Sequence, residues 1–331
     1  MKAVQPLWIR RLILETKVRE FFYVRDFLET RTPLLVSSPG LEPHIFPLEV
    51  KRPKGPSVFL PTSPEFAMKK LLARGVPKIF QLASAFRDEP ASPDHSPEFT
   101  LLEFYETNIQ LEQLQERIEE LFRFLARECS EAKPIVFRGE EIDLDQPWLR
   151  LRIPDLFLEH VNIDLRTHLS SESLAHACEM HNIQVQAHEP WDDLYFKLWL
   201  NLIEPKLPKN KPCFVTHYPL SQSSLCNPIL DEKGFAWANR FEVYVGQFEL
   251  GNAFDELRDS KKQRRNFEHD QKIRREIYGD AVPTSPIDEE FIAALEKMEP
   301  TCGIALGVDR MAMLILGAAT IEEVIPLPSF W

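Results

Sequence analysis

The first regular pattern of apolar residues lies near the start of the chain. Over Leu12–Leu28, apolar side chains recur at spacings of three and four residues, which is typical of an amphipathic helix. The chain then reaches Thr32-Pro33. Because proline ends helices and favours extended chain, we expect this helix to give way to a strand at Pro33.

Two pairs of segments have the character of β-hairpins. Lys78–Glu89 and Glu98–Glu106 are strand-like and are joined by a stretch rich in proline and serine. Arg240–Val245 and Gln247–Leu250 form a second candidate, with a turn near Gly246. We expect both pairs to be antiparallel.

Helices alternate with these strands along the rest of the chain. Leu111–Cys129 is rich in strong helix formers, and Arg258–Tyr278 reads as a highly charged helix. Ser285–Asp288 has the signals of a helix start. Gly303–Val308 reads as a short apolar strand that runs into a helix from Asp309. Strands mixed with helices and hairpins predict an α/β (α+β) core with an antiparallel sheet.

The chain reads as one domain over residues 1–331. The part at about 133–212 is predicted to be a mostly helical insertion, with proline-bounded pieces such as Trp191–Ile203. The apolar fraction of 44% is ordinary for a folded protein.

Charge and cysteine content exclude several classes of function. The net charge is −12, from 39 basic and 51 acidic side chains, which is the wrong sign for a protein that mainly grips nucleic-acid backbones. The five cysteines are odd in number and scattered, so a disulfide framework or a zinc site is not expected. No apolar stretch approaches the ~20 residues needed to span a bilayer. We therefore expect a cytoplasmic protein without a membrane contact.

The first hairpin carries residues suited to a nucleotide. Arg87 and Glu89 are expected to share a face of one strand, and Phe99, Glu103 and Tyr105 a face of the other, because side chains alternate along a strand. His95 lies in the connecting loop. Arginine can form two parallel hydrogen bonds with a phosphate, and an aromatic ring can stack on a base. Taken singly, each residue fits a solvated sheet face with surface ion pairs better, and only the set as a whole suits a nucleotide.

The second hairpin carries two carboxylates. With a turn at Val245-Gly246, Glu242 and Glu249 would be direct cross-strand neighbours, where like charges repel. A Mg²⁺ ion would relieve this repulsion, since it accepts one or two protein carboxylates together with substrate phosphates. Solvation of both side chains is the alternative.

Further along, Asn252 and Glu256 are placed to hold an amine, although ordinary turn and helix-start chemistry explains them equally well. Gly307-Val308-Asp309-Arg310 lies at a strand-to-helix junction, where free amides and an arginine suit phosphate. Tight glycine packing beside a surface arginine is the alternative. Ser63-Pro64-Glu65 is unspecific by itself.

Taken in this order, the pieces resemble the catalytic domain of class II aminoacyl-tRNA synthetases, in particular the lysine branch. Motif 1 of that family is similar to Phe27–Pro33, motif 2 to Phe86–Glu89 with His95–Glu103, and motif 3 to Gly303–Arg310. Thr62–Glu65 and Glu249–Leu257 also match. The resemblance runs nearly from end to end, so it is specific although each part is weak.

Two features narrow the resemblance. Lysyl-tRNA synthetases carry an anticodon-binding β-barrel before motif 1, and here motif 1 starts almost at Met1, so we expect that domain to be absent. Ala305 stands where the full-length enzymes usually have glycine. Both features are similar to the elongation factor P–(R)-β-lysine ligase family, a paralogue of the class II lysyl-tRNA synthetases. The resemblance implies ATP-dependent activation of (R)-β-lysine or lysine as its adenylate, and transfer to a lysine side chain of elongation factor P.

The resemblance also implies roles for individual residues. Arg87 and Arg310 would be catalytic, by neutralising phosphate charge. The residues implied to bind ATP are Arg87, Asp88, Glu89, His95, Ser96, Phe99, Glu249, Leu250, Gly307 and Arg310. Those implied to bind the amino acid are Ser63, Pro64, Glu65, Glu103, Tyr105, Asn252, Phe254, Glu256 and Ala305. Glu242 and Glu249 would bind Mg²⁺, and motif 1 would form a homodimer.

The chain departs from the family pattern in three places. The motif 2 loop reads Pro93-Asp94-His95-Ser96 where many relatives have Arg-x-His-Asn, which removes one phosphate contact and puts the role of His95 in doubt. Asp88 replaces a usual asparagine and Ala253 a usual glycine.

Two other functions fit the sequence less well. A truncated synthetase acting on tRNA is disfavoured by the acidic balance. A non-catalytic, amino-acid-binding regulatory paralogue has no reason to retain Arg87, Glu89, Glu249 and Arg310. The basic residues of Arg258–Tyr278 suit a solvated helix face, and docking of an acidic protein there is a further hypothesis.

Overall fold

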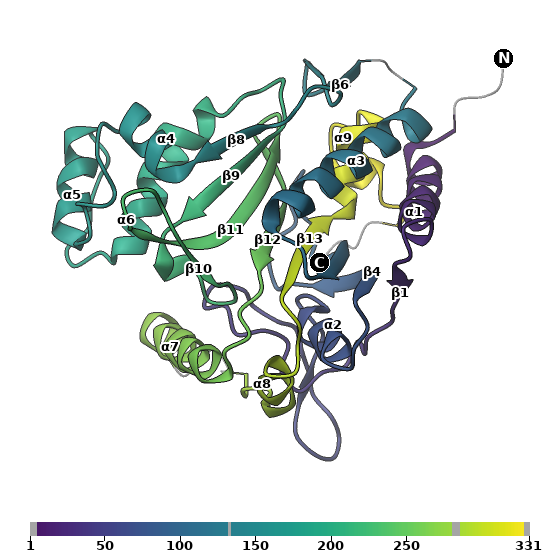
Figure 1. Cartoon of the computed structure of the whole chain (residues 1–331), viewed down its shortest axis with the longest axis horizontal. Coiled ribbons are helices and arrows are strands. Elements are labelled where there is room, and N and C mark those ends of the chain that lie inside the picture. Colours follow the sequence, from purple (N-terminus) through teal and green to yellow (C-terminus); the bar gives the residue numbers. More distant parts are fainter. Residues whose placement is uncertain (1–4, 132–133, 280–284, 328–331) are drawn as a thin grey trace.

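The protein is described by a computed structural model that covers residues 5–131, 134–279 and 285–327 (Figure 1). The largest sheet contains β1 (Leu28–Glu29), β4 (Lys78–Phe86), β5 (Glu98–Thr107), β8 (Leu149–Arg152), β9 (Cys213–Tyr218), β10 (Pro228–Leu230), β11 (Ala236–Val245), β12 (Phe248–Asp255) and β13 (Thr301–Gly307). Two short hairpins are formed by β2 (Glu49–Val50) with β3 (Val58–Phe59), and by β6 (Ile135–Phe137) with β7 (Glu140–Ile142).

The strands of the large sheet follow the order β1-β4-β5-β13-β12-β11-β9-β8, and β10 pairs with β11. The pairs β1–β4 and β8–β9 are parallel, and the other pairs are antiparallel. This antiparallel-dominated sheet confirms the predicted fold class. Both predicted hairpins are present as β4–β5 and β11–β12, with strand ends shifted by a few residues.

Helices cover the sheet (Figure 1). They are α1 (Leu7–Tyr23), α2 (Glu65–Leu72), α3 (Leu111–Cys129), α4 (Ile153–His160), α5 (Ser171–Met180), α6 (Trp191–Leu198), α7 (Ser260–Tyr278), α8 (Glu289–Leu295) and α9 (Val308–Leu316). Short helical turns lie at η1 (Trp199–Ile203), η2 (Glu204–Lys206), η3 (Leu220–Gln222) and η5 (Ile321–Glu323). The predicted helix Leu111–Cys129 and the junction of β13 with α9 are confirmed.

The two faces of the central strands serve different purposes. Phe80, Phe104 and Ile304 point into a core that they share with residues of α1, α3 and α9. The alternate positions point to the opposite face, where Glu103 and Ala305 are cross-strand neighbours. Burying one face against three helices therefore fixes which side chains the other face presents.

The predicted first helix and strand were misplaced. The helix is Leu7–Tyr23 rather than Leu12–Leu28, and the strand that follows is Leu28–Glu29 rather than at Pro33. The helix ends early because Asp26 adopts a left-handed conformation with φ of 62°, which turns the chain toward β4. At the other end of the chain, α8 begins at Glu289 with Asp288 as its cap, so the predicted start at Ser285 was also wrong.

The segment predicted as a mostly helical insertion begins at Lys133, which lies outside the described residues. Its described part contains α4, α5 and α6, but also the β6–β7 hairpin and β8. β8 extends the large sheet by pairing with β9. Apolar residues of α4, α5 and α6 form a core of their own against β9 and β11.

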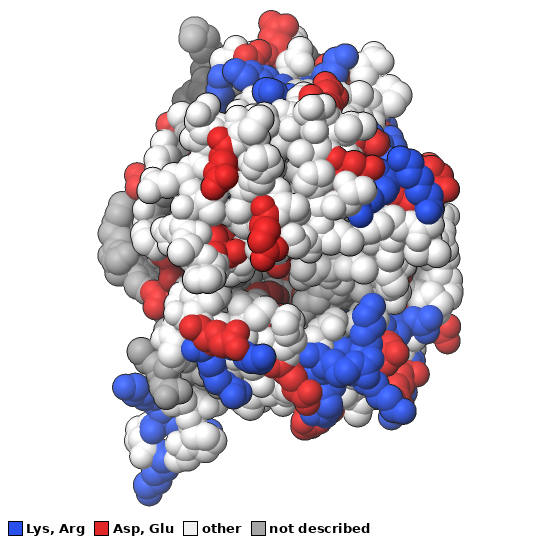
Figure 2. All heavy atoms as spheres, turned by 90° about the vertical axis from the view of Figure 1, so that its left-hand side faces the viewer, with Lys and Arg blue, Asp and Glu red and all other residues white. Residues whose placement is uncertain are grey.

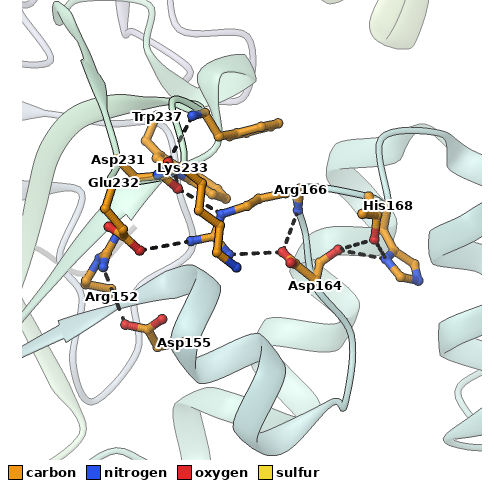
Figure 3. Close-up of polar contacts among 11 residues, drawn as sticks. Arg152, Asp155, Asp164, Arg166, His168, Asp231, Glu232, Lys233 and Trp237 are labelled. Atoms are coloured by element: carbon orange, nitrogen blue, oxygen red, sulfur yellow. Dashed lines mark hydrogen bonds and ion pairs between the residues drawn. The ribbon is translucent and has the colours of Figure 1, made fainter.

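A buried aspartate ties this part to the sheet (Figure 3). Asp231 accepts hydrogen bonds from the backbone N–H groups of Lys233 and Phe235 and from Nε1 of Trp237, each at 2.9 Å. Nε of Arg166, between α4 and α5, donates to the same carboxylate at 2.8 Å. Burial opposes ionisation, but these bonds outweigh it and hold the pKa of Asp231 well below its usual range. The aspartate therefore connects the β10–β11 turn to the helices as a carboxylate.

None of the helices in the described ranges is both long and apolar enough to cross a lipid bilayer.

Candidate active site

Strand β13 lies between the two long hairpins and brings their polar residues together. Ala305 pairs with Glu103 of β5 on one side and with Asn252 of β12 on the other. Gly303 is two residues earlier, on the same face, and pairs with Tyr105 of β5. The middle strand thus joins residues from distant parts of the chain into one surface.

A β-bulge corrects the predicted geometry of the acidic pair. Glu242 pairs with Asn252, and Tyr244 pairs with Glu249, so the prediction that Glu242 and Glu249 stand directly opposite was wrong. The register shifts between Val243 and Tyr244, which leaves an extra residue in β12. Because of this extra residue, Glu249 and Asn252 share a face, although residues three apart normally point to opposite sides of a strand.

Glu103 is the centre of a buried polar pocket. Oγ of Ser63 donates a hydrogen bond to Oε1 of Glu103 at 2.5 Å, and the hydroxyl of Tyr105 donates to Oε2 at 2.9 Å. Burial and the charge of Glu65 raise the pKa of Glu103 to about 8, although these hydrogen bonds oppose the shift. A protonated carboxyl that becomes charged when a cation arrives suits the binding of an ammonium group.

Gly303 makes room for this pocket. A Cβ atom at Gly303 would overlap the ring of Tyr105 and would lie 2.7 Å from Oε1 of Glu256. Contacts this short do not occur between a Cβ and a fixed neighbour, so a side chain at this position would displace both residues. The glycine therefore allows a phenol and a carboxylate to meet at one point of the sheet.

Lys69 of α2 is a member of the site that the sequence analysis missed. Its Nζ atom forms ion pairs with Glu65 and, at 2.5 Å, with Oε2 of Glu256. Burial lowers the pKa of Lys69, but the charges of Glu256 and Glu65 outweigh it, so the pKa lies above its usual range. A signal was present in the sequence, because Phe66, Lys69 and Leu72 share one face of the helix. A lysine at a position that helical spacing assigns to the buried face indicates that an acidic partner is buried with it.

A cavity of about 300 Å³ opens beside this pocket. Every residue that the resemblance assigned to ATP lines it except Asp88, and Asn252 and Ala305 from the predicted amino-acid set line it as well. We call it the nucleotide cavity. It contains two arginines from distant parts of the chain, Arg87 and Arg310, together with the ring of Phe99.

Arg87 and Glu89 lie outside the strand in which they were predicted. β4 ends at Phe86, so the two residues do not share a strand face, and the prediction that they do was wrong. Arg87 is still held close to the hairpin, because its backbone N–H donates to the carbonyl of Pro97 at 2.9 Å. Its guanidinium carbon lies 5.1 Å from the ring centre of Phe99. Nε of Arg87 is buried and, among the described residues, has no hydrogen-bond partner.

Arg310 is fixed at the first turn of α9. Nη1 donates to the carbonyl of Glu249 at 2.8 Å, and Nη2 donates to Nε2 of His95 at 2.6 Å. Burial and the charge of Arg310 lower the pKa of His95, so its ring is a neutral acceptor. The preceding residue, Asp309, forms a buried ion pair with Arg11 of α1 at 2.9 Å. This pair anchors the start of α9 and with it Arg310.

The acidic pair on β11 and β12 suits a hard cation bound together with phosphates. Oε2 of Glu242 accepts a hydrogen bond from Tyr244 at 2.9 Å, and Nη2 of Arg240 pairs with Oε1 at 2.5 Å. Burial and the charge of Glu242 raise the pKa of Glu249 to about 7. The unfavourable charge at Glu249 is what a divalent ion would relieve. Within the described residues, no group of three or more acidic, histidine or cysteine side chains forms a complete metal site.

Several residues of the predicted amino-acid set lie around a second cavity of about 440 Å³. Ser63, Pro64 and Glu65 line it at the start of α2, and we call it the outer cavity. Six residues of the predicted site line neither cavity: Asp88, Glu103, Tyr105, Glu242, Phe254 and Glu256. The backbone N–H of Asp88 donates to the carbonyl of Phe46 at 2.8 Å, and Phe254 packs against the core of α4, α5 and α6. Both therefore lie beside the site as supports.

Comparisons with known proteins agree with this geometry. Residues 2–330 match the family described as tRNA synthetases class II (D, K and N). Proteins named elongation factor P–(R)-β-lysine ligase from Klebsiella pneumoniae (strain 342) and Salmonella typhi are 34% and 33% identical over 328 residues, which is 97% of this chain and 94% of each relative. The protein of that name from Yersinia pestis (strain Pestoides F) is 34% identical over 331 residues, with the same coverage. The chain belongs to the tRNA synthetases class II (D, K and N).

Proposed function

We propose that this protein uses ATP to activate (R)-β-lysine or lysine as its aminoacyl-adenylate and transfers the aminoacyl group to a lysine side chain of elongation factor P. The relatives that match nearly the whole chain carry the name of this activity. A member of the same family that acts on tRNA, or one that binds an amino acid without catalysis, is the alternative.

One observation carries the proposal: a buried acidic pocket lies next to a cavity that contains two arginines. Glu103, Glu65 and Glu256 suit the ammonium groups of a diamino acid, and Arg87 and Arg310 suit phosphates. Asn252 and Ala305 lie between them on the sheet, where the carboxylate of the amino acid would meet the α-phosphate. Specificity for a diamine and activation by a nucleotide are thus combined on one surface.

The first step requires positioning and charge neutralisation. The carboxylate of the amino acid attacks the α-phosphorus, the bond to the bridging oxygen breaks, and pyrophosphate leaves with the electron pair. Arg87, whose Nε atom has a free buried donor among the described residues, would hold the α-phosphate. Phe99 would stack on the base, and Arg310 would hold the far phosphates. Glu242 and Glu249 would hold Mg²⁺, which neutralises pyrophosphate charge.

The second step delivers the aminoacyl group to a protein amine. The amine of the acceptor lysine attacks the carbonyl carbon of the adenylate, and AMP leaves with the electron pair of the broken mixed-anhydride bond. A basic surface on α7 suits an acidic protein partner: the exposed side chains are Lys261, Arg265, Lys272 and Arg275. Figure 2 views the side of the molecule that lies at the left in Figure 1. Lysine and arginine side chains gather in the lower half of this side, at the height of α7.

A homodimer is also part of the proposal. Exposed apolar side chains follow one another along the end of α1 and the segment after it: Tyr23, Val24, Leu28, Leu34 and Leu35. Among the described strands, β1 is the last of the large sheet on this side. An apolar patch beside an open sheet edge suits a second copy of the chain.

The proposal is tested in two stages. Amino-acid-dependent exchange between ATP and pyrophosphate is measured with (R)-β-lysine and α-lysine in parallel. Elongation factor P is then incubated with the enzyme, ATP and the preferred amino acid, and its mass is expected to rise by one aminoacyl residue. Absence of exchange with either amino acid supports the non-catalytic alternative, and aminoacylation of tRNA in place of elongation factor P supports the other.

A further inference from the structure

Residues 42–45, in the chain before α2, run from the outer cavity to the nucleotide cavity. Glu42 lines the outer cavity together with Ser63 and Glu65, and three residues later Ile45 lines the nucleotide cavity. The segment is held from behind by Arg274 of α7, whose Nη1 atom donates to the carbonyls of Glu42, Pro43 and Ile45 at 2.9–3.2 Å. Its position between the cavities is therefore fixed.

The carboxylate of Glu42 has an unusual environment. Its Oε2 atom is buried and, in the parts of the chain that the structure describes, has no hydrogen-bond partner. Burial and the charge of Glu65 raise the pKa of Glu42, and the charge of Arg87 opposes the shift. Burying a carboxylate oxygen without a hydrogen-bond partner costs free energy. A bound cationic group would remove this cost.

Gly40 allows this carboxylate to fold back toward the site. Its φ of +141° lies in the region that favours glycine, and a Cβ there would lie 2.7 Å from Oε2 of Glu42 and 2.9 Å from Oγ1 of Thr62. Thr62 directly precedes Ser63, whose hydroxyl binds Glu103. The local backbone thus places the carboxylate of Glu42 beside the residues that surround the buried pocket.

We infer that Glu42 binds the second ammonium group of a diamino acid, the one close to the carboxylate of the substrate. This inference rests on the proposed function. The far ammonium would lie in the pocket of Glu103 and Glu256, and the carboxylate must reach the α-phosphate near Arg87. A second amine one or two carbons from that carboxylate then lies on the side of Arg87 and Glu65, where Glu42 is. The residue distinguishes a diamino acid from a chain with a single terminal amine.

The test uses an analogue that lacks the second amine. In the variant Glu42→Gln, the KM for (R)-β-lysine in ATP–pyrophosphate exchange is expected to rise about 10–100-fold, as for the loss of a hydrogen bond to a charged group. The inhibition constant of 6-aminohexanoic acid, which has the far amine and the carboxylate alone, is expected to stay unchanged. Glu42→Asp keeps the charge and is expected to recover much of the lost affinity.

Glu49→Gln is the matched control, because Glu49 is an exposed carboxylate later in the same part of the chain. Calorimetric titration of (R)-β-lysine provides a second readout that does not depend on catalysis. Equal weakening of (R)-β-lysine and 6-aminohexanoic acid in Glu42→Gln would overturn the inference, as would unchanged binding of both. A wild-type protein that binds no diamino acid contradicts the proposed function and this inference together, whereas the variant results concern Glu42 alone.

Discussion

Nζ of Lys69 lies 2.5 Å from Oε2 of Glu256, and both side chains are 1% exposed. The same ammonium also pairs with Glu65, so one lysine balances two of the carboxylates that surround the proposed amine pocket. An ion pair this deep is stable as long as both partners remain, because removal of one leaves an isolated buried charge.

Substitution of Lys69 is therefore expected to destabilise the protein. Lys69→Met leaves Glu65 and Glu256 without their cation, and the free energy of unfolding is expected to fall by about 3–5 kcal/mol. Urea unfolding followed by circular dichroism measures this. Lys70→Met is the matched control, because the neighbouring lysine pairs with Asp288 and Glu290 near the surface and is expected to contribute less than about 1 kcal/mol. Equal losses in the two variants would contradict the importance of the buried pair.

The second prediction concerns the proton that Glu103 releases when an amine binds. The pKa of Glu103 is about 8 in the ligand-free protein, so this carboxyl is mostly protonated at pH 7. An ammonium ligand favours the carboxylate, so binding is expected to release a proton and to become tighter as the pH rises toward about 8. Calorimetric titration at pH 7 in buffers with different ionisation enthalpies counts the protons released. Glu103→Gln is expected to reduce this release, and the remainder comes from Glu256, whose pKa is also raised to about 8. A binding enthalpy that is the same in all buffers would contradict the assignment.

The raised pKa of Glu103 also makes the stability of the ligand-free protein depend on pH. A carboxyl whose pKa rises from 4.5 to about 8 on folding makes the native state bind more protons than the unfolded state between these values. Since stability falls with pH wherever the native state binds more protons, Glu103 is expected to lower the stability of the ligand-free protein as the pH rises through this window. Glu103→Gln is expected to flatten this part of the profile of unfolding free energy against pH.

The third prediction concerns Gly303. A methyl group there would overlap Tyr105 and approach Glu256, so Gly303→Ala is expected to lose about 1–3 kcal/mol of stability and most ATP–pyrophosphate exchange. Gly307→Ala is the comparison for folding, because its Cβ would meet side-chain atoms of Arg310 at ordinary distances of 3.7–3.8 Å. If Gly303→Ala has wild-type stability and activity, the pocket is less tightly packed than these contacts indicate.

The fourth prediction separates docking from chemistry. Reversing two exposed charges of α7, in Lys261→Glu/Arg265→Glu, is expected to raise the KM for elongation factor P about 10-fold at low salt while ATP–pyrophosphate exchange stays unchanged. Arg127→Glu on α3 shows the effect of a charge reversal away from this surface, since Arg127 is exposed on a different helix. A modification rate whose salt dependence is the same in the double variant and the wild type would remove the case for this surface.

The fifth prediction concerns assembly. Val24→Asp places a charge in the exposed apolar patch near β1, and sedimentation velocity is expected to show a shift from dimer to monomer at micromolar concentration. Leu169→Asp is the control, because Leu169 is an exposed apolar residue elsewhere on the chain. A wild-type protein that is monomeric under these conditions would end the proposal of a homodimer.

Most strands and helices were predictable from the sequence, because alternation and helical spacing directly reflect burial. Most of the residues that line the nucleotide cavity were assigned by the resemblance to class II synthetases, not by spacing. The faces of β12 were not, since one extra residue in the bulge inverts the parity that connects Glu249 with Asn252. The end of α1 was missed because Asp26, rather than Pro33, turns the chain. The spacing of Lys69 on α2 indicated burial, but its partner Glu256 and the surroundings of Glu42 come from segments that meet only in three dimensions.

The position of β13 has a consequence for how such a site can diversify. Gly303, Ala305 and Gly307 point to the same side, and at ~3.4 Å per residue the first and last are about 14 Å apart. Gly303 adjoins the amine-binding end and Gly307 the phosphate-binding end, so the strand sets the span available to the carbon chain of the substrate. Exchange of the middle residue alone alters the width of that span while both ends keep their chemistry. Position 305 is therefore one place at which selection for a new amino acid can act.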